Sequence, residues 1–108
     1  MRICVVGAGA IGGYLAVELA AAGHDVTIIA RGSHLDAIRK HGLRLVYRDG
    51  AEHTAHLPGT SSFADAGQHD LVIVALKAHQ IPAVAAEIPR LFHELTTVLT
   101  LQNGIPWW

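Results

Sequence analysis

RICVVGAGAIGG, at Arg2–Gly13, is the stretch that decides the fold. An apolar run at Ile3–Val6 leads into the spacing G-x-G-x-x-G at Gly7, Gly9 and Gly12, and a helical pattern follows directly. The first glycine lets the chain turn sharply off a strand, the second lets a pyrophosphate approach the backbone, and the third lets the helix pack on the strand. The helix N-terminus then offers unpaired N–H groups to phosphates. This pattern favours a dinucleotide-binding turn, and a tight turn without a ligand is the alternative.

The residues after this turn predict a strand–helix–strand unit. The helix is expected over 10–22, with Gly23 ending it, and the second strand over Asp25–Ala30. The expected buried stripe of the helix consists of Ile11, Leu15, Leu19 and Ala22. Two parallel strands joined this closely by a helix form a right-handed βαβ unit.

The middle of the chain predicts a short helix and a hairpin. Ser33 is expected to cap the helix, with Asp36 in the position of a capping box, and the helix ends at Gly42. Alternating residues over 43–48 and the Asp49-Gly50 pair then indicate a hairpin. The return strand is expected over 52–57, followed by a loop over 58–62 and a helical turn over 63–66.

The last third predicts two more parallel strands. Asp70–Leu76 is continuously apolar, as a strand covered on both faces should be, and Thr97–Leu101 is the final strand. Between them a helix is expected, with Pro89 kinking or breaking it near Ile88. Its expected apolar face consists of Ile81, Val84, Ala85, Ile88, Phe92 and Leu95. The fold class is therefore α/β: one Rossmann-like, doubly wound domain over 1–108, with a mainly parallel sheet and a β-hairpin insertion.

Composition excludes several classes of protein. The chain has 108 residues, of which 51% are hydrophobic and 16% charged, as expected for one globular domain. A net charge of −1 without a basic stripe argues against nucleic-acid binding, and no apolar run is long enough for a membrane span. The single cysteine, Cys4, is expected to be a buried, inert thiol. Together with the lack of a signal-peptide pattern, this fits the cytoplasm.

Arg31 is the most informative residue after the glycines. It follows the second predicted strand, where an acidic residue would bind the ribose 2′-hydroxyl of NAD and an arginine the 2′-phosphate of NADP. A planar guanidinium pairs well with phosphate. Asp36 is the only nearby acid and is placed in the next helix. Arg31 therefore favours NADP(H), against the alternative of a solvated strand-end arginine.

Lys77 and Asn103 follow the third and fourth apolar strands in the same way. In an open parallel sheet, ligands bind outside the carboxyl ends of the strands, so the glycine turn, Arg31, Lys77 and Asn103 are expected to converge on one edge. A solubilising charge and a plain turn are the alternatives for Lys77 and Asn103.

The eight histidines do not predict a metal site. His53 and His56 would lie on opposite faces of a strand, and no carboxylate or cysteine completes a set with His34 and His41. No Ser-His-Asp or Cys-His grouping indicates nucleophilic catalysis.

Three segments together resemble a known family. ICVVGAGAIGGYLAVELAAAGHDVTIIARG, LVIVALKAHQ and LTLQNGIPWW resemble the N-terminal domain of the ketopantoate reductases (2-dehydropantoate 2-reductases) over essentially the whole chain. The segment 43–68 is the least typical part.

The resemblance implies an NADPH-dependent reduction of 2-dehydropantoate to pantoate, in the cytoplasmic pathway to pantothenate. The implied cofactor residues are Gly7, Ala8, Gly9, Ala10, Ile11, Gly12, Arg31, Lys77 and Asn103. Asn103 would also meet the substrate, a small 2-oxo acid. The family's general-acid lysine and substrate-binding glutamate come from a helical domain absent here, so no catalytic residue is expected in 1–108, and the chain is expected to be an inactive fragment.

Three alternatives stay open. The chain could belong to an NADP-dependent reductase of the same superfamily with another substrate, to a nucleotide-sensing module without chemistry, or to a folded remnant kept for dimerisation. Trp107 and Trp108 are expected to pack on a further domain or on a second copy in a homodimer.

Overall fold

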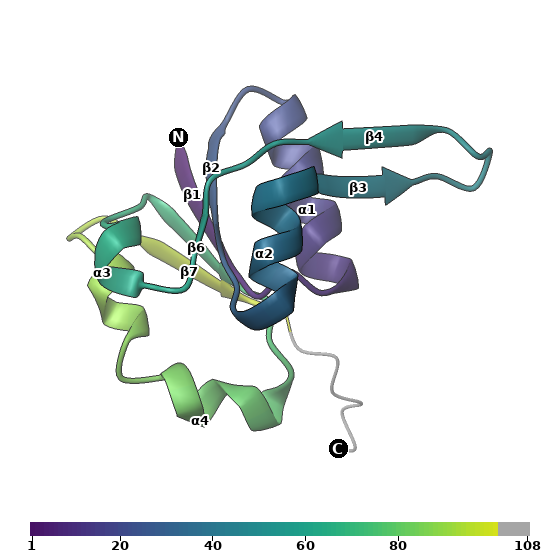
Figure 1. Ribbon diagram of the computed structural model, residues 1–108. Coiled ribbons are helices and arrows are strands. Elements are labelled where there is room, and N and C mark those ends of the chain that lie inside the picture. Colours follow the sequence, from purple (N-terminus) through teal and green to yellow (C-terminus); the bar gives the residue numbers. More distant parts are fainter. Residues whose placement is uncertain (102–108) are drawn as a thin grey trace, which may run out of the picture.

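The computed structural model describes residues 1–101, in which a five-stranded parallel sheet carries helices on both faces (Figure 1). The sheet order is β5-β2-β1-β6-β7. Its strands are β1 (Arg2–Val6), β2 (Asp25–Ile29), β5 (Gly59–Thr60), β6 (Leu71–Val74) and β7 (Thr97–Thr100). Because the chain starts at the centre and winds outward in both directions, the predicted doubly wound α/β fold is confirmed.

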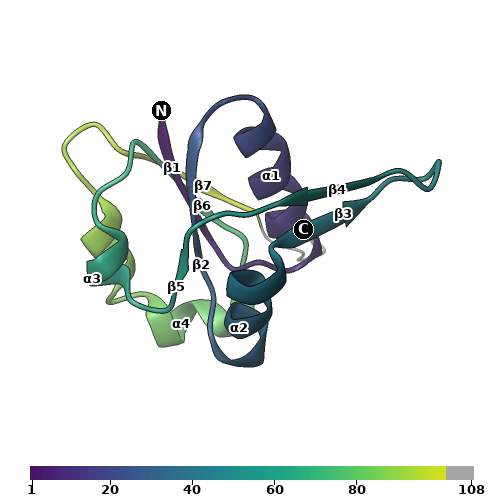
Figure 2. The same cartoon turned by 45° about the horizontal axis from the view of Figure 1, so that its top comes forward.

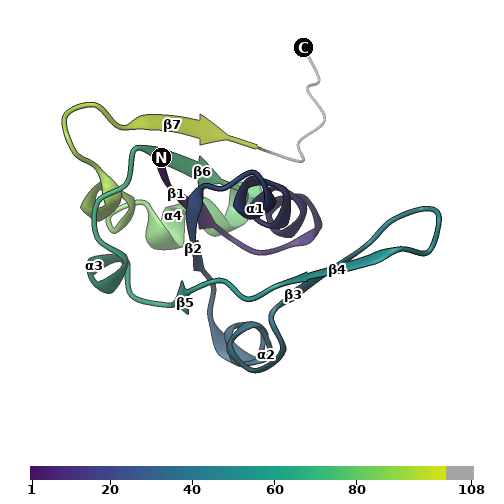
Figure 3. The same cartoon turned by 90° about the horizontal axis from the view of Figure 1, so that it is seen from above.

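The helices fall into two layers, seen from above in Figure 3. One layer holds α1 (Ala10–Ala21) and α2 (Gly32–His41), and the other α3 (Phe63–Ala66), α4 (Ile81–Val84) and the 3-10 turn η2 (Ile88–Leu91). The predicted hairpin, β3 (Leu43–Val46) and β4 (Glu52–Ala55), extends away from the sheet beside α1 (Figures 1 and 2).

Alternate residues of the central strands fill two cores. Ile3 and Val5 of β1 pack on the α1 side, and Cys4 and Val6 pack on the α3 side. All four are at most 1% exposed, because β1 lies between β2 and β6 and is covered on both faces. Burial raises the pKa of the Cys4 thiol to about 12, so this cysteine is inert, as the sequence predicted.

The predicted buried stripe of α1 is confirmed in part: Leu15 and Leu19 pack against the core, but Ile11 and Ala22 do not. Ile11 is 47% exposed and Ala22 is exposed, whereas the helix buries Gly12, Ala16 and Val17. Most of α1 is apolar, so hydrophobic spacing could not select a face. The face is set instead by small residues that let the helix approach β1. Gly23, with a φ of +97°, ends the helix as predicted.

The start of α2 also differs from the prediction. The cap is Arg31, without a side-chain hydrogen bond to the helix, and Ser33 lies inside the helix. Gly32, with a φ of +66°, lets the chain enter the helix two residues earlier than a cap at Ser33 would.

The hairpin turn is confirmed at Asp49-Gly50. The Tyr47 carbonyl accepts the Gly50 N–H at 3.0 Å, and the Asp49 carboxylate accepts the Ala51 N–H at 2.9 Å. The Tyr47 hydroxyl donates to the Glu18 carboxylate and so ties the hairpin to α1. The return strand is shorter than predicted and ends at Ala55.

Two segments have a more complex secondary structure than the sequence predicted. The expected loop over 58–62 contains β5, which pairs with β2 at the sheet edge. The expected helix over 81–95 is divided into α4 and η2, and the break lies just before Pro89, where it was predicted. Two residues of its expected apolar face, Ala85 and Leu95, are exposed. Every helix within 1–101 is too short or too polar to span a lipid bilayer.

His69 is buried at the opposite end of the sheet from the glycine turn. Its side chain is 1% exposed, Nδ1 lies 2.9 Å from the Gly67 carbonyl oxygen, and Nε2 has no hydrogen-bond partner in the described part of the chain. Burial lowers the pKa of His69 below its ordinary value; the hydrogen bond to the Gly67 carbonyl opposes this shift, Arg2 adds to it, and Asp25 and Asp70 oppose it more weakly. The neutral form of His69 is therefore favoured more in the folded protein than in the unfolded chain.

We expect acid to destabilise the fold through His69. Because the pKa of His69 is lower in the folded state, its contribution to the free energy of unfolding is complete above about pH 6.5, the ordinary pKa of histidine. Below that pH the contribution is lost, because His69 takes up a proton in the unfolded chain before it does so in the folded protein. One such proton changes the free energy of unfolding by at most about 1.4 kcal/mol per pH unit. Urea unfolding near pH 7.5 and pH 5.5 should show a smaller pH dependence for His69→Leu than for the unmodified chain; an equal dependence would contradict this account.

Candidate functional site

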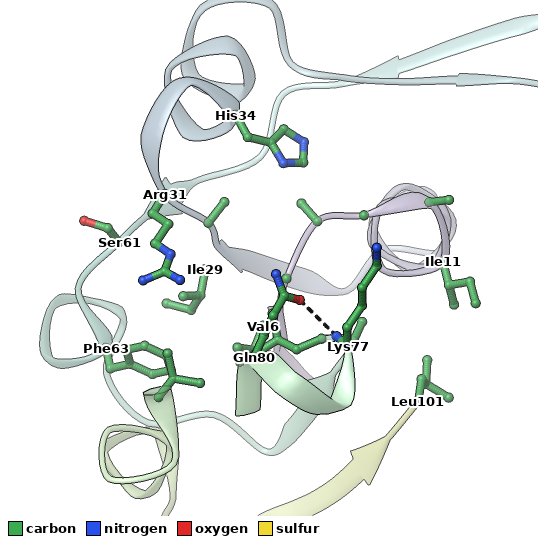
Figure 4. Close-up of a pocket in the computed structure, with 18 residues that line it drawn as sticks. Val6, Ile11, Ile29, Arg31, His34, Ser61, Phe63, Lys77, Gln80 and Leu101 are labelled. Atoms are coloured by element: carbon green, nitrogen blue, oxygen red, sulfur yellow. Dashed lines mark hydrogen bonds between the residues drawn. The ribbon is translucent and has the colours of Figure 1, made fainter. Parts of the chain in front are cut away.

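A pocket of about 440 Å³ lies at the carboxyl ends of β1, β2 and β6 (Figure 4). The glycine turn after β1 forms its floor, and the residues following β2 and β6 form its sides. The turn itself is fixed by the sheet, because the Gly7 N–H donates to the Ile29 carbonyl at 2.9 Å and the Ala75 N–H donates to the Val6 carbonyl at 2.9 Å. The edge predicted for ligand binding is therefore a real concave site.

Two of the three glycines are required by the fold. Gly7 has a φ of +96°, and a Cβ there would lie 2.9 Å from the Ala75 carbonyl oxygen. A Cβ on Gly12 would overlap the Gly7 carbonyl oxygen and lie 3.0 Å from the Ala75 Cβ. The first glycine makes the turn, and the third lets α1 pack against the end of β1. These are the roles that the G-x-G-x-x-G spacing predicts for them.

Gly9 has no such requirement. Its φ of −69° and ψ of −168° suit any residue, and a Cβ there would meet nothing within 4 Å. Gly9 lines the pocket and caps α1 without a side-chain hydrogen bond. The first N–H groups of a helix lack intrahelical partners, and the first turn of α1 has no acidic side chain. The pocket floor is thus bare backbone with partial positive charge.

The charged residues of the pocket are all basic. Arg31 and Lys77 line it from the ends of β2 and β6, and among the described residues that line it there is no Asp or Glu. In Figure 4 the Lys77 amino group extends toward the start of α1, whereas the Arg31 guanidinium points toward Ile29 and Phe63. An elongated anion with charge near its middle and at one end would fit this arrangement.

The structure brings together most of the predicted site. Gly7, Ala8, Gly9, Ala10, Ile11, Arg31 and Lys77 all line the pocket. Gly12 is buried behind it and serves packing, and Asn103 lies outside the described residues. Asp36, the only nearby acid noted in the sequence, is absent from the lining.

Four further polar or aromatic residues of the pocket lining were not predicted from the sequence. The additional polar and aromatic residues are His34, Ser61, Phe63 and Gln80. Gln80 carried a usable signal, since it lies three residues after Lys77 and such a spacing allows the side chain to reach back to the turn's first N–H. Ser61 and Phe63 carried none, because they reach the pocket only through the pairing of β5 with β2.

Comparison with known proteins identifies the family. A family model described as ketopantoate reductase PanE/ApbA matches residues 3–106. The 2-dehydropantoate 2-reductase of Mesorhizobium japonicum is 48% identical over 109 residues, which cover 100% of this chain and 33% of that protein.

Solved structures agree. The crystal structure of a PanE/ApbA family ketopantoate reductase from Ralstonia eutropha matches with a TM-score of 0.86 and 34% identity, covering 96% of this chain and 35% of that one. A D-mandelate dehydrogenase solved with NADH and anilino(oxo)acetate matches with a TM-score of 0.85 and 34% identity, covering 98% of this chain and 35% of that one. The chain thus spans about a third of the length of the relatives it matches, and it belongs to the ketopantoate reductase family.

Proposed function

We propose that the chain, over 1–108, is the NADPH-binding domain of a 2-dehydropantoate 2-reductase. The observation that carries this proposal is the pocket itself, in which the bare N-terminus of α1 meets Arg31 and Lys77 without any carboxylate in the described lining. Such a site suits a ligand with several phosphates. Membership in the ketopantoate reductase family supports the proposed reaction. Because the chain spans only about a third of the length of its relatives, the activity is proposed for the whole protein and not for residues 1–108 alone.

Each residue has a defined task in this proposal. The backbone of Gly9, Ala10 and Ile11 holds the pyrophosphate, Arg31 binds the 2′-phosphate, and Lys77 adds a second positive charge. A bound nicotinamide would supply the hydride that reduces the keto group of a 2-oxo acid. Asn103 is assigned to the junction of cofactor and substrate. No residue lining the pocket is proposed as the acid that protonates the developing alkoxide.

The proposal places the protein in the cytoplasm and in pantothenate synthesis. The family members named 2-dehydropantoate 2-reductase support the substrate. The free, buried thiol of Cys4 suits a reducing compartment but does not require one.

Arg31→Ala should remove a preference for NADPH over NADH. A charge-assisted hydrogen bond contributes roughly 1.5–3 kcal/mol, so we expect about ten- to a hundred-fold tighter binding of NADPH, lost in the variant. Calorimetric titration with both nucleotides measures this. Arg48→Ala, at the exposed hairpin tip, removes the same charge away from the pocket and should change neither affinity. Equal affinities in the unmodified chain would contradict the assignment of Arg31.

A second candidate is a reductase for a different 2-oxo acid that uses NADH. The likeness to a D-mandelate dehydrogenase solved with NADH favours it. The same titration separates the two candidates, because tighter binding of NADH than of NADPH would support the second.

A further inference from the structure

The side chain of Gln80 closes the turn that carries Lys77. Gln80 is the last residue of the 3-10 turn η1 (Ala78–Gln80), and its Oε1 accepts the Lys77 N–H at 3.0 Å, drawn as the dashed line in Figure 4. The Gln80 N–H in turn donates to the Lys77 carbonyl at 2.8 Å. Two hydrogen bonds therefore hold Lys77 in an extended conformation, with a φ of −66° and a ψ of 148°.

The first of these bonds also fixes which end of the amide faces the pocket. Of the two ends of the Gln80 amide only the oxygen can accept the Lys77 N–H, so the amide cannot be flipped without losing the bond. The NH₂ group consequently points away from Lys77, toward the pocket and the glycine turn (Figure 4). Within 1–101 no hydrogen bond of this NH₂ group is present, and Gln80 lines the pocket. Two donors are thus offered to whatever occupies it.

The turn alone does not explain a glutamine at this position. Glutamate accepts the same N–H equally well, and its negative charge would lie directly before the first residue of α4, where it is favourable. A ligand in the pocket would distinguish glutamine from glutamate at this position. A carboxylate would place a negative charge beside an anionic ligand and would offer it no hydrogen-bond donor. The amide satisfies both the turn and the pocket.

We propose that Gln80 is a further binding and positioning residue of the cofactor site. Its NH₂ group donates to an oxygen of the bound dinucleotide, and its Oε1 holds the backbone from which Lys77 reaches the same ligand. This inference rests on the proposed function, since it assumes that the pocket takes NADPH.

Gln80→Glu separates the two roles. It keeps the acceptor for the Lys77 N–H but removes the donors, so thermal unfolding should be unchanged and the Kd for NADPH should rise roughly tenfold or more. His79→Glu is the matched control, because it adds the same charge to the same turn on an exposed residue outside the pocket. The control should bind within about threefold of the unmodified chain. Equal binding by the Gln80→Glu and control variants would overturn the donor role, and a lower melting temperature for Gln80→Glu would overturn the assigned cap.

A double-variant cycle tests the positioning role. Gln80→Met removes both the cap and the donors, and Lys77→Met removes the amino group. If Gln80 positions Lys77, the loss of affinity in the double variant is smaller than the product of the two single losses. Losses that multiply would show that the residues act independently. Failure of the unmodified chain to bind NADPH would instead refute the proposed function, which keeps the two failures distinct.

Discussion

Gly12→Ala is expected to destabilise the folded protein by about 3 kcal/mol or more, a large share of the total for a domain of this size. The added methyl would overlap the Gly7 carbonyl oxygen and press on the Ala75 side chain, which a Cβ would approach to 3.0 Å. Neither neighbour can yield by rotating a side chain. Either α1 moves away from β1 or the glycine turn distorts. Urea unfolding, read by far-UV circular dichroism, measures the loss.

Gly13→Ala is the matched control in the same helix. A Cβ at Gly13 would make only ordinary contacts, 3.7 Å from the Ala8 carbonyl oxygen and 3.9 Å from Leu43. Since alanine is the better helix former by roughly 0.5–1 kcal/mol, this variant should match or exceed the unmodified chain in stability. Similar losses in both variants would mean that the close approach at Gly12 is not what the glycine provides.

Gly9→Asp is expected to abolish nucleotide binding while leaving the fold intact. Aspartate is among the best helix caps, its charge suits the α1 N-terminus, and a Cβ at Gly9 meets no atom within 4 Å. In the proposed complex the carboxylate would stand where the pyrophosphate lies. Like charges at about 4 Å repel by up to roughly 4 kcal/mol at a protein surface, so the Kd for NADPH should rise at least about a hundredfold.

Gly9→Ala separates charge from bulk at the same position. The single methyl should weaken binding by less than the aspartate does, and the free energy of unfolding should stay within about 1 kcal/mol in both variants. Binding by Gly9→Asp within threefold of the unmodified chain would show that the phosphates lie elsewhere.

The central strands were predictable because they are continuous apolar runs bounded by glycines and charges. The buried face of α1 was predictable only in part, because a mostly apolar helix has no distinct polar side from which its orientation can be inferred. The strand β5 was missed for a different reason. Gly59 and Thr60 are too few for a periodic signal, and their pairing with Ile28 and Ile29 is a tertiary contact.

The candidate site was predictable as far as the parallel sheet imposes it. Strand ends in such a sheet share one edge, so the glycine turn, Arg31 and Lys77 could be brought together from strand positions alone. The positions of Ser61 and Phe63 could not be predicted in this way, because they follow β5, which is too short to show strand periodicity in the sequence. Gln80 lay between these cases, because its spacing from Lys77 permits the hydrogen bond but does not require it.

The most direct test of the account is to map NADPH binding on the chain by ¹H–¹⁵N correlation spectroscopy. If NADPH binds in the pocket, the amide signals of the glycine turn, Arg31, Lys77 and Gln80 should shift, and those of the hairpin tip near Gly50 and of His69 should stay unchanged. Shifts confined to other residues, or none at millimolar NADPH, would contradict the claim that this pocket binds the dinucleotide.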